Sequence, residues 1–271
     1  MENMKISIIT PSFNQGRFIE ECIKSVLYQN YENFEHIIID ACSTDNTLDV
    51  LSKYRHLIWI SEKDKGQSDA LNKGLDIASG DIIGWLNADD YYCPDAFKKI
   101  SRIFNNNYDV RWLVGNLYNK YEILNKLDPL PFVETSYKNL KKNCDILRTQ
   151  ATFFRKNLIN EAGKFDINLH MSMDYDAWLK MAKISPPYNL KEYLCIFRVH
   201  TDQKTTPKNS IKQYKELFFI LLNEKAYIAL IRKLYKLLKS MLKWNIKTIL
   251  IYFKIIDKNF SNVPFRTRNI K

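Results

Sequence analysis

The first ninety residues alternate short apolar, β-rich runs with helical patterns, and this alternation limits the folds open to the chain. Segments whose apolar residues recur at helical spacing separate four strand-like runs. Strands that alternate with helices of about ten residues are typical of βαβ units in a parallel sheet with helices on both faces. We therefore expect strands at 5–10, 34–40, 57–60 and 81–86, and helices at 17–28, 47–54 and 68–78.

The next hundred residues predict a second group of elements with less regular connections. Residues 120–150 have no clear period, so we expect a loop-rich segment there. Ser172 precedes a helical pattern with acids in its first turn and is the expected N-cap. The pattern predicts helices at 94–107 and from 173 onward, and strands at 110–118, 151–155 and 193–200.

Polar and acidic side chains stand where the predicted strands end. Thr10 to Asn14 follow the first strand, Asp40 ends the second, and Asn87-Ala88-Asp89-Asp90 follow the fourth. Ligands of parallel sheets bind at this edge. Adjacent carboxylates suit Mg²⁺ or Mn²⁺, which can bridge a diphosphate, whereas the same four residues are also good turn formers. The residues alone leave both interpretations open.

The basic charge of the chain lies in its C-terminal part. The formal charge is +11, but residues 201–271 hold 16 Lys and Arg against 4 Asp and Glu, and the first 200 hold 25 against 26. A helical wheel of residues 226–243 separates an apolar half from a lysine-rich half. Such helices are typical of membrane interfaces. A helix packed on the body with a solvated lysine face, or a dimer contact, remains an alternative.

Several classes of protein are disfavoured. The five cysteines are odd in number and widely spaced, so neither a disulfide framework nor a CxxC metal site is expected, which favours a reducing compartment. The chain shows no signal peptide pattern and no apolar run near the ~18 residues that span a bilayer. No G-x-G-x-x-G follows the first strand and no glycine-rich loop lies near the start, which argues against a dehydrogenase and a nucleotidyltransferase.

Four sequence blocks in one order resemble family 2 glycosyltransferases of the GT-A fold. They are residues 7–14 (SIITPSFN), 37–47 (IIIDACSTDNT), 61–74 (SEKDKGQSDALNKG) and 85–90 (WLNADD). Two departures stand out: Asn87 replaces the first Asp of a full Asp-x-Asp-Asp, and Ala41-Cys42 replace two glycines. The resemblance implies an α/β, Rossmann-like, mostly parallel sheet flanked by helices, followed by a C-terminal helical basic extension. It also implies a catalytic domain at 1–205, with a nucleotide-binding half at 1–100 and an acceptor half at 101–205, and a basic amphipathic tail at 206–271.

The resemblance also assigns donor-site roles. Thr10, Pro11 and Asn14 would line the nucleotide pocket, and Asp40 would accept the imide N–H of uracil or thymine. Asp64 and Asp69 would lie beside the ribose and the donor sugar, and Asp89 would contact ribose or metal. The metal, Mg²⁺ or Mn²⁺, would be held by Asp89, Asp90 and His200, the last from the segment FRVHTDQKT.

The acceptor side needs a base for inverting transfer, because a carboxylate must take the proton of the incoming hydroxyl. Residues 173–179 (MDYDAWL) resemble the family segment in which this base lies. Asp174 is the first candidate and Asp176 the second. An acid in a first helical turn is also favoured by the helix dipole alone.

The function expected is therefore an inverting, metal-dependent glycosyltransferase. It would move a sugar from a nucleotide-diphosphate donor, a UDP-sugar above all, to a hydroxyl of a lipid-linked glycan in cell-surface polysaccharide synthesis. We expect a cytoplasmic protein that is peripheral on the inner face of the cell membrane through residues 226–271, with a homodimer possible and no nucleic acid. The alternative is a basic nucleic-acid-binding protein with a Rossmann-like domain, which the near-neutral body disfavours.

Overall fold

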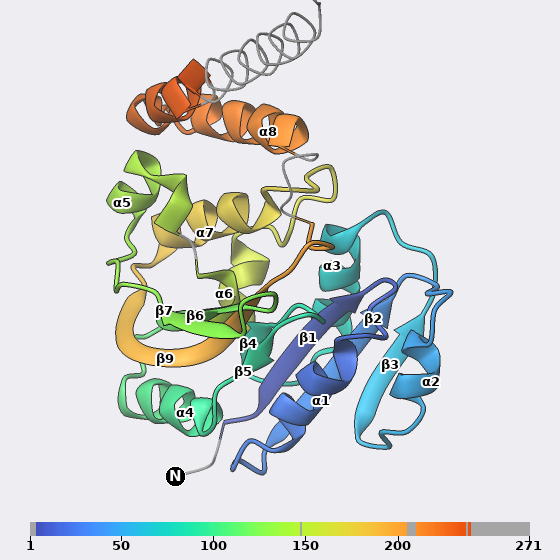
Figure 1. Ribbon diagram of the computed structural model, residues 1–271. Coiled ribbons are helices and arrows are strands. Elements are labelled where there is room, and N and C mark those ends of the chain that lie inside the picture. The colour runs from blue at the N-terminus through green and yellow to red at the C-terminus, as the bar shows by residue number, and fades with distance from the viewer. Residues whose placement is uncertain (1–3, 147, 205–209, 237, 240–271) are drawn as a thin grey trace, which may run out of the picture.

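The structure, a computed structural model, describes residues 4–146, 148–204, 210–236, 238 and 239. One nine-stranded sheet runs through the molecule with helices on both of its faces (Figure 1). The strand order is β3-β2-β1-β4-β8-β6-β9-β5, and β7 pairs with β6 outside this path. The predicted α/β class is confirmed.

The first half of the sheet is parallel, as the alternating pattern predicts. Strands β1, β2, β3 and β4 pair only in parallel with one another, and the register aligns Ser12 of β1 with Asp40 of β2 and Asp40 with Ser61 of β3. The three strands thus end at one level, where polar side chains gather. The elements are β1 (Ile6–Ser12), α1 (Ile19–Leu27), β2 (Phe34–Asp40), α2 (Thr47–Leu51), β3 (Leu57–Ser61), α3 (Gln67–Ile77) and β4 (Ile82–Trp85).

The second half contains elements that the sequence pattern did not predict. The segment expected to be loop-rich carries β7 (Lys126–Pro129) and α5 (Tyr137–Lys142), and the short strand β5 (Tyr91–Tyr92) and helix α6 (Lys156–Glu161) are also new. Strand β9 begins at Tyr188, five residues before the expected start. The other elements are α4 (Ala96–Asn106), β6 (Trp112–Tyr121), 3₁₀ turns at Cys144–Ile146 and Thr149–Ala151, β8 (Thr152–Arg155), α7 (Met173–Ile184) and β9 (Tyr188–Val199).

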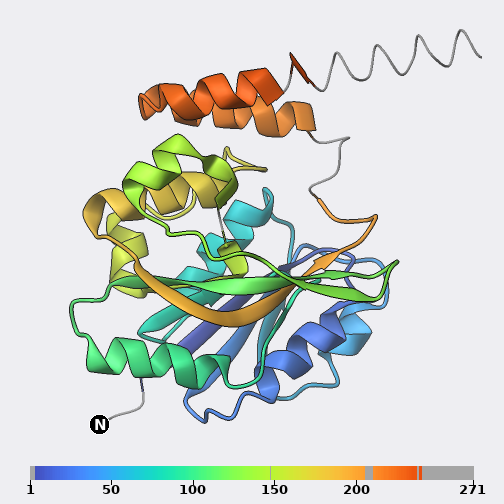
Figure 2. The same ribbon diagram turned by 60° about the vertical axis from the view of Figure 1, so that its left-hand side comes forward.

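Antiparallel pairs enter the sheet in this second half. Strand β8 is antiparallel to both β4 and β6, whereas β9 lies parallel to β6 and antiparallel to β5. Two register shifts, between Val114 and Asn116 and between Asn116 and Leu117, interrupt the β6–β9 ladder. Irregularities of this kind bend a strand and increase its twist. Strand β9 is accordingly curved, and its end returns toward the carboxyl ends of β1 and β4 (Figure 2).

The two faces of the sheet are covered by different helices. Along β1, Ile9 belongs to the cluster that contains α3, α6 and α7, whereas Ile6 and Ile8 belong to the cluster that contains α1 and α4. All three side chains are buried, and each contributes about 1.5 to 3 kcal/mol of burial free energy. The continuous apolar run of β1 thus reflects a strand that is covered on both sides.

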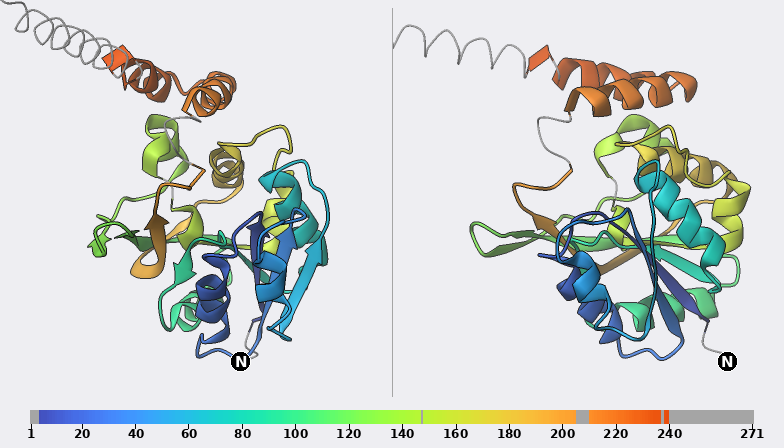
Figure 3. Two further views of the ribbon diagram at one scale, coloured as in Figure 1. Left: turned by 45° about the vertical axis from the view of Figure 1, so that its right-hand side comes forward. Right: turned by 90° about the vertical axis from the view of Figure 1, so that its right-hand side faces the viewer.

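A helical layer lies over α5 and α7, on the far side of the molecule from the N-terminus (Figures 1 and 3). It consists of α8 (Ser210–Asn223) and the helical residues 227–236. Leu217, Ile220, Leu221, Ala226 and Ala229 join the same buried cluster as α7, so this layer packs on the body of the molecule. The predicted helix at 226–243 is present over its described part, and residues 240–271 of the predicted tail lie outside the described residues. The division of the chain after residue 205 stays a prediction.

Candidate active site

A pocket of about 860 Å³ opens at the carboxyl ends of the parallel strands. Its walls come from the loops after β1 and β4, from the loop that enters α3, and from the first turn of α7. Four residues with an expected role line it: Pro11, Asp64, Asp89 and Asp174. Strands β6 and β9 contribute Leu117, Asn119 and Phe197, and the segments next to strands β7 and β8 contribute Leu130, Thr149 and Gln150.

The loops after β1 and β2 are locked together by side chains. The carboxylate of Asp40 is fully buried and accepts hydrogen bonds from the Ser43 amide (2.9 Å), the Ser43 hydroxyl (2.5 Å) and the Ser61 hydroxyl (2.7 Å). Asn14 accepts from the Thr44 amide at 2.8 Å and donates its own amide to the Ser43 hydroxyl at 2.8 Å. Asp40 and Asn14 therefore shape these loops and do not line the pocket.

Two positions of these loops adopt left-handed backbone conformations. Asn14 has φ of 52° and Cys42 has φ of 57°. Asparagine tolerates this region, whereas cysteine does so at a cost that glycine would avoid. Cys42, which stands where the family has glycine, therefore still adopts the left-handed backbone conformation. Thr10, the remaining candidate of this strand, turns its hydroxyl to His36 Nε2 at 2.9 Å and away from the pocket.

The loop before α3 is held by its own acids. Asp64 accepts the Gly66 amide at 2.8 Å and borders the pocket, and Gly66 has φ of 114°, a conformation that suits glycine. Asp69 accepts the Lys65 amide at 3.1 Å and pairs with Lys73 at 3.6 Å. Asp69 thus stabilises the loop through these contacts and is not part of the pocket wall.

Asp89 and His200 meet beside the pocket. Asp89 Oδ2 lies 3.1 Å from His200 Nε2, and the Asp202 amide lies 3.3 Å from His200 Nδ1, which must accept its proton. The imidazole proton is therefore on Nε2 and is donated to Asp89. The Asp89 side chain is 20% exposed, so it can also reach a ligand in the pocket.

Asp90 points into the protein. It is fully buried and accepts hydrogen bonds from Gln150 Nε2 (2.8 Å), the Arg198 amide (2.9 Å) and Asn87 Nδ2 (3.3 Å). Burial, and then the charge of Asp89, raise the pKa of Asp90 well above its usual value. Among the described residues no group of three or more His, Cys, Asp or Glu side chains could hold a metal ion, so the expected set Asp89, Asp90 and His200 is not assembled. The reason is that three donors from β9, Gln150 and Asn87 occupy Asp90.

The two base candidates have different surroundings. Asp174 lines the pocket, and its carboxylate accepts the Thr149 hydroxyl at 2.9 Å and the Tyr175 amide at 2.8 Å. Burial raises the pKa of Asp174, and the hydrogen bond from Thr149 opposes that shift. Asp176 pairs with Lys180 at 2.6 Å and is not in the pocket wall. The geometry therefore distinguishes two acids that the sequence left as alternatives.

The comparison with protein families is decisive for this chain. The sequence model of Glycosyl transferase family 2 matches residues 7–162, which is more than half of the chain. The chain belongs to glycosyl transferase family 2.

Two relatives illustrate this membership. An uncharacterized glycosyltransferase of Rickettsia typhi is 31% identical over 227 residues, which cover 79% of this chain and 70% of the relative. The Escherichia coli protein WfgD, a UDP-Glc:alpha-D-GlcNAc-diphosphoundecaprenol beta-1,3-glucosyltransferase, is 31% identical over 232 residues, which cover 82% of this chain and 87% of WfgD. The nucleic-acid-binding alternative has no support from these matches.

Solved structures share the fold at low sequence identity. S. aureus TarS 1-349 in complex with UDP-GlcNAc matches with a TM-score of 0.67 and 18% identity, over 80% of this chain and 65% of that chain. The mannosyltransferase PcManGT from Pyrobaculum calidifontis, in complex with GDP-Man and Mn²⁺, matches with a TM-score of 0.59 and 17% identity, over 80% and 63% of the two chains. This family 2 protein thus spans somewhat less than two thirds of these longer chains and shares their fold.

Several polar residues of the glycosyltransferase site were not singled out from sequence. Gln67 Nε2 and Trp85 Nε1 both donate to Asn87 Oδ1 at 2.9 Å, which gives the replaced Asp-x-Asp-Asp position a structural role. Thr149 and Gln150, which contact Asp174 and Asp90, come from a segment without any periodic signal. Only the proximity of that segment to the strand-end acids in the folded chain identifies these residues.

Two further features of the described residues are the lack of a membrane-spanning helix and the state of the cysteines. No helix among the described residues has the length and apolar character needed to cross a membrane. All five cysteines are free, and Cys42 is the exposed one among them.

Proposed function

We propose that this glycosyltransferase transfers a sugar, with inversion, from a UDP-sugar to a hydroxyl of a lipid-linked glycan. The observation that carries the proposal is that Asp89, after β4, and Asp174, on α7, open into the same pocket. Inverting transfer needs one group near the departing diphosphate and a base near the incoming hydroxyl. The printed activity of WfgD and the UDP-GlcNAc complex of TarS support this class of donor and acceptor.

The donor side would bind the nucleotide and a divalent cation. Pro11 and Asp64 would contact the nucleotide and sugar, since both line the pocket. Asp89 and His200 would hold Mg²⁺ or Mn²⁺, since the Asp89 carboxylate is a hard oxygen ligand and lies 3.1 Å from His200 Nε2. For His200 to bind through Nε2, its proton would have to move to Nδ1 and the 3.3 Å contact with the Asp202 amide would have to open. When bound, the cation would neutralise charge that develops on the leaving diphosphate.

The remaining donor-side candidates would act through the loops they hold. Thr10, Asn14 and Asp40 would fix the backbone around the nucleobase and the ribose of the donor. Asp69 would fix the segment that carries Asp64. Asp90 would orient its neighbour Asp89, since its own oxygens accept three protein donors.

The acceptor side would supply the base. A carboxylate oxygen of Asp174 would take the proton of the acceptor hydroxyl while the hydroxyl oxygen bonds to the anomeric carbon. The bond between that carbon and the diphosphate oxygen would break, and UDP would leave with the electron pair. Thr149 would keep the carboxylate oriented through its hydrogen bond of 2.9 Å.

The product of the reaction tests this proposal. UDP-glucose and UDP-GlcNAc are each incubated with Mn²⁺ and a synthetic GlcNAc-diphospholipid, and the anomeric configuration of any product is read by NMR. An α-linked donor should give a β-linked product. A product that retains the donor configuration would contradict the inverting assignment, and turnover of neither donor with this acceptor would contradict the proposed substrates.

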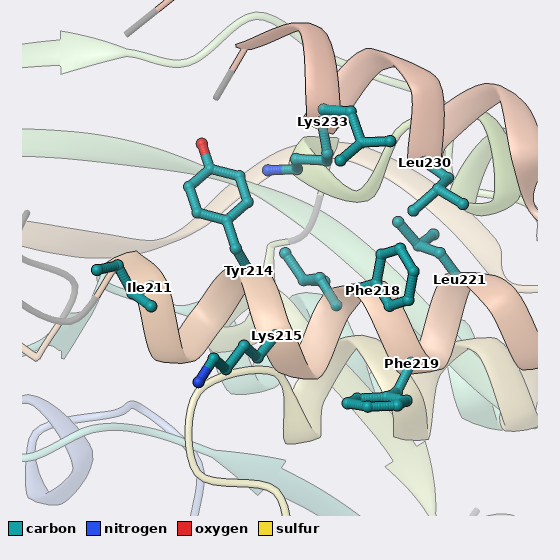
Figure 4. A pocket seen from close by; sticks show the side chains of 10 residues that line it. Ile211, Tyr214, Lys215, Phe218, Phe219, Leu221, Leu230 and Lys233 are labelled. Carbon is teal, nitrogen blue, oxygen red and sulfur yellow. The ribbon is translucent and has the colours of Figure 1, made fainter. Parts of the chain in front are cut away.

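We also propose that the helical layer attaches the enzyme to the inner face of the cell membrane as a peripheral protein. An apolar groove of about 520 Å³ lies between α8 and residues 227–236, and Lys215 and Lys233 lie at its edge (Figure 4). Phe219, which lines the groove, is 63% exposed, and Ile231 of the same helical layer is 65% exposed. Apolar side chains among lysines match the acyl chains and headgroups of anionic lipids. The predicted contribution of residues 240–271 and the predicted homodimer stay predictions.

A further inference from the structure

The segment that leads into α7 is held by a residue of the C-terminal helical layer. The carboxylate of Glu216, on α8, accepts hydrogen bonds from three consecutive amides: His170 at 3.0 Å, Met171 at 2.7 Å and Ser172 at 3.0 Å. Hydrogen bonds to an ionised carboxylate are stronger than neutral ones, and three of them on one short segment fix its backbone. Glu216 lies 44 to 46 positions away along the chain.

The same segment borders the active pocket. Met171 and Met173 line the pocket together with Asp174, which follows two residues after the last amide that Glu216 binds. Any displacement of residues 170–172 would therefore move the carboxylate proposed as the base.

No local residue substitutes for Glu216 at this helix start. Ser172 occupies the N-cap position of α7, as expected from sequence, but its side chain makes no capping hydrogen bond. Its hydroxyl is buried and has no hydrogen-bond partner among the described residues. The carboxylate that binds the amides before α7 is therefore supplied by Glu216 of α8. Its negative charge lies at the N-terminus of α7 and interacts favourably with the dipole of α7.

The opposite side of the segment is fixed independently by α3. Ser68 donates its hydroxyl to the Leu169 carbonyl at 2.7 Å, and Asn72 donates to the Phe165 carbonyl at 2.8 Å and accepts the Phe165 amide at 3.1 Å. Residues 165–169 thus stay anchored to the body when Glu216 is changed, and residues 170–172 depend on Glu216.

We propose that Glu216 is a positioning residue of the transferase: its carboxylate fixes residues 170–172 and thereby sets Asp174 against the acceptor hydroxyl. The inference rests on the proposed role of Asp174. It makes α8 part of the transferase machinery in addition to its place in the proposed membrane surface.

A matched control lies just beyond the same helix. Glu224 pairs with Lys183 of α7 at 2.6 Å and accepts the Tyr137 hydroxyl at 3.1 Å, so it also ties the helical layer to the body, but it does not touch residues 170–172. Leu217, Ile220 and Leu221 keep α8 packed in either variant. Glu216→Ala and Glu224→Gln therefore separate loop positioning from helix docking.

The direct test is amide hydrogen exchange of the full chain, followed in peptides that cover residues 168–175. Glu216→Ala should accelerate exchange of the 170–172 amides by about tenfold or more, Glu216→Asp should restore part of the protection, and Glu224→Gln should leave it unchanged. Unchanged protection in Glu216→Ala, or equal loss in Glu224→Gln, would overturn the proposal.

Kinetics supply the functional readout, with UDP-glucose and a synthetic GlcNAc-diphospholipid as probes. Glu216→Ala should lower kcat for transfer by about 10- to 100-fold, because a misplacement of about 1 Å has such effects, while UDP affinity and donor KM stay within about twofold. Glu224→Gln should stay within about twofold throughout. A kcat of Glu216→Ala near that of the wild type would contradict the positioning role.

Asp174→Asn distinguishes the two possible failures. If Asp174→Asn abolishes transfer and Glu216→Ala does not, the positioning role is wrong and the base assignment holds. If Asp174→Asn transfers normally, the proposed function itself is wrong, whatever Glu216 does.

Discussion

The donor side and the acceptor side of the pocket are held in place by different kinds of contact. On the donor side, the loops after β1 and β2 are joined by hydrogen bonds between residues about 30 positions apart, such as Asn14 with Thr44, within one βαβ unit. On the acceptor side, Asp174 depends on Thr149 and on the segment that Glu216 binds from α8. The donor side is thus built by a local, repeating pattern, and the acceptor side is assembled from separate parts of the chain.

Asp89 and Asp90 give the same contrast at the scale of two adjacent residues. Asp89 faces the pocket and contacts His200, whereas Asp90 is buried among donors from β9 and Gln150. Neighbouring acids in one motif therefore have separate roles, one toward the ligand and one toward the protein.

On the donor side, the largest effect is expected at the acid that faces the ligand. Asp89→Asn should lower donor turnover by about 100- to 1,000-fold, because it removes a charge beside the departing diphosphate. Steady-state rates with UDP-glucose and Mn²⁺ measure it. A rate within about threefold of the wild-type rate would contradict the assignment of Asp89 as a cation ligand.

Asp90→Asn should be much milder. An amide has the size of the carboxyl group and keeps one oxygen for the Arg198 amide, whereas its nitrogen would face the Gln150 and Asn87 donors. We therefore expect donor turnover to fall by about tenfold. The raised pKa of Asp90 means that the unfolded state releases this proton more readily, so wild-type stability should decline as pH rises above the ordinary value of 3.8. With chelator present, the Tm of Asp90→Asn minus the Tm of the wild type should therefore increase between pH 5 and pH 8. A loss of turnover as large as that of Asp89→Asn would restore Asp90 as a cation ligand.

The membrane surface should respond to charge placed on its apolar side chains. Ile231→Glu combined with Tyr235→Glu should weaken binding to anionic liposomes by about tenfold, because two exposed apolar groups are replaced by acids. Ile123→Glu, at an exposed site near the β6–β7 turn, is the control and should have no effect. Equal loss in both variants would indicate a general charge effect and exclude a defined surface.

Truncations separate the tail from the helical layer. Truncation after residue 239 keeps every described contact of α8 and of residues 227–236, so it is the reference chain for Tm. Removal from residue 226 onward should lower Tm below that of the reference chain, because Ala226 and Ala229 are buried in the main cluster. Equal melting temperatures would show that the two alanines add little to the core.

The smallest effect concerns the pH profile. Thr149 donates to Asp174 and lowers its pKa, against the raising effect of burial. Thr149→Val should therefore move the acidic limb of the rate profile to higher pH, since the base must be ionised to act. A limb that stays in place or moves to lower pH would mean that Asp174 does not control it.

The sequence predicted the donor half well because its information is local. Strands such as 34–40 show continuous apolar runs, and the acids at their ends lie in recognisable blocks. The family, the fold and the location of the strand-end acids followed from that pattern.

What sequence missed depends on contacts between distant segments. The direction of the Asp90 side chain is set by β9, more than a hundred positions away, and nothing in the Asn-Ala-Asp-Asp segment indicates it. Elements such as α5 and β7 are too short to show a periodic pattern in the sequence, and packing against the rest of the fold stabilises them. The role of Glu216 is invisible in sequence for the same reason.

The choice of base is the central claim, and one comparison tests it most directly. Asp174→Asn and Asp176→Asn are assayed side by side for transfer from UDP-glucose and for UDP binding by calorimetry. Asp174→Asn should lower kcat by about 100- to 10,000-fold with UDP affinity unchanged, and Asp176→Asn should stay within about threefold, since it loses only the ion pair with Lys180. Loss of transfer in Asp176→Asn with activity kept in Asp174→Asn would contradict the account.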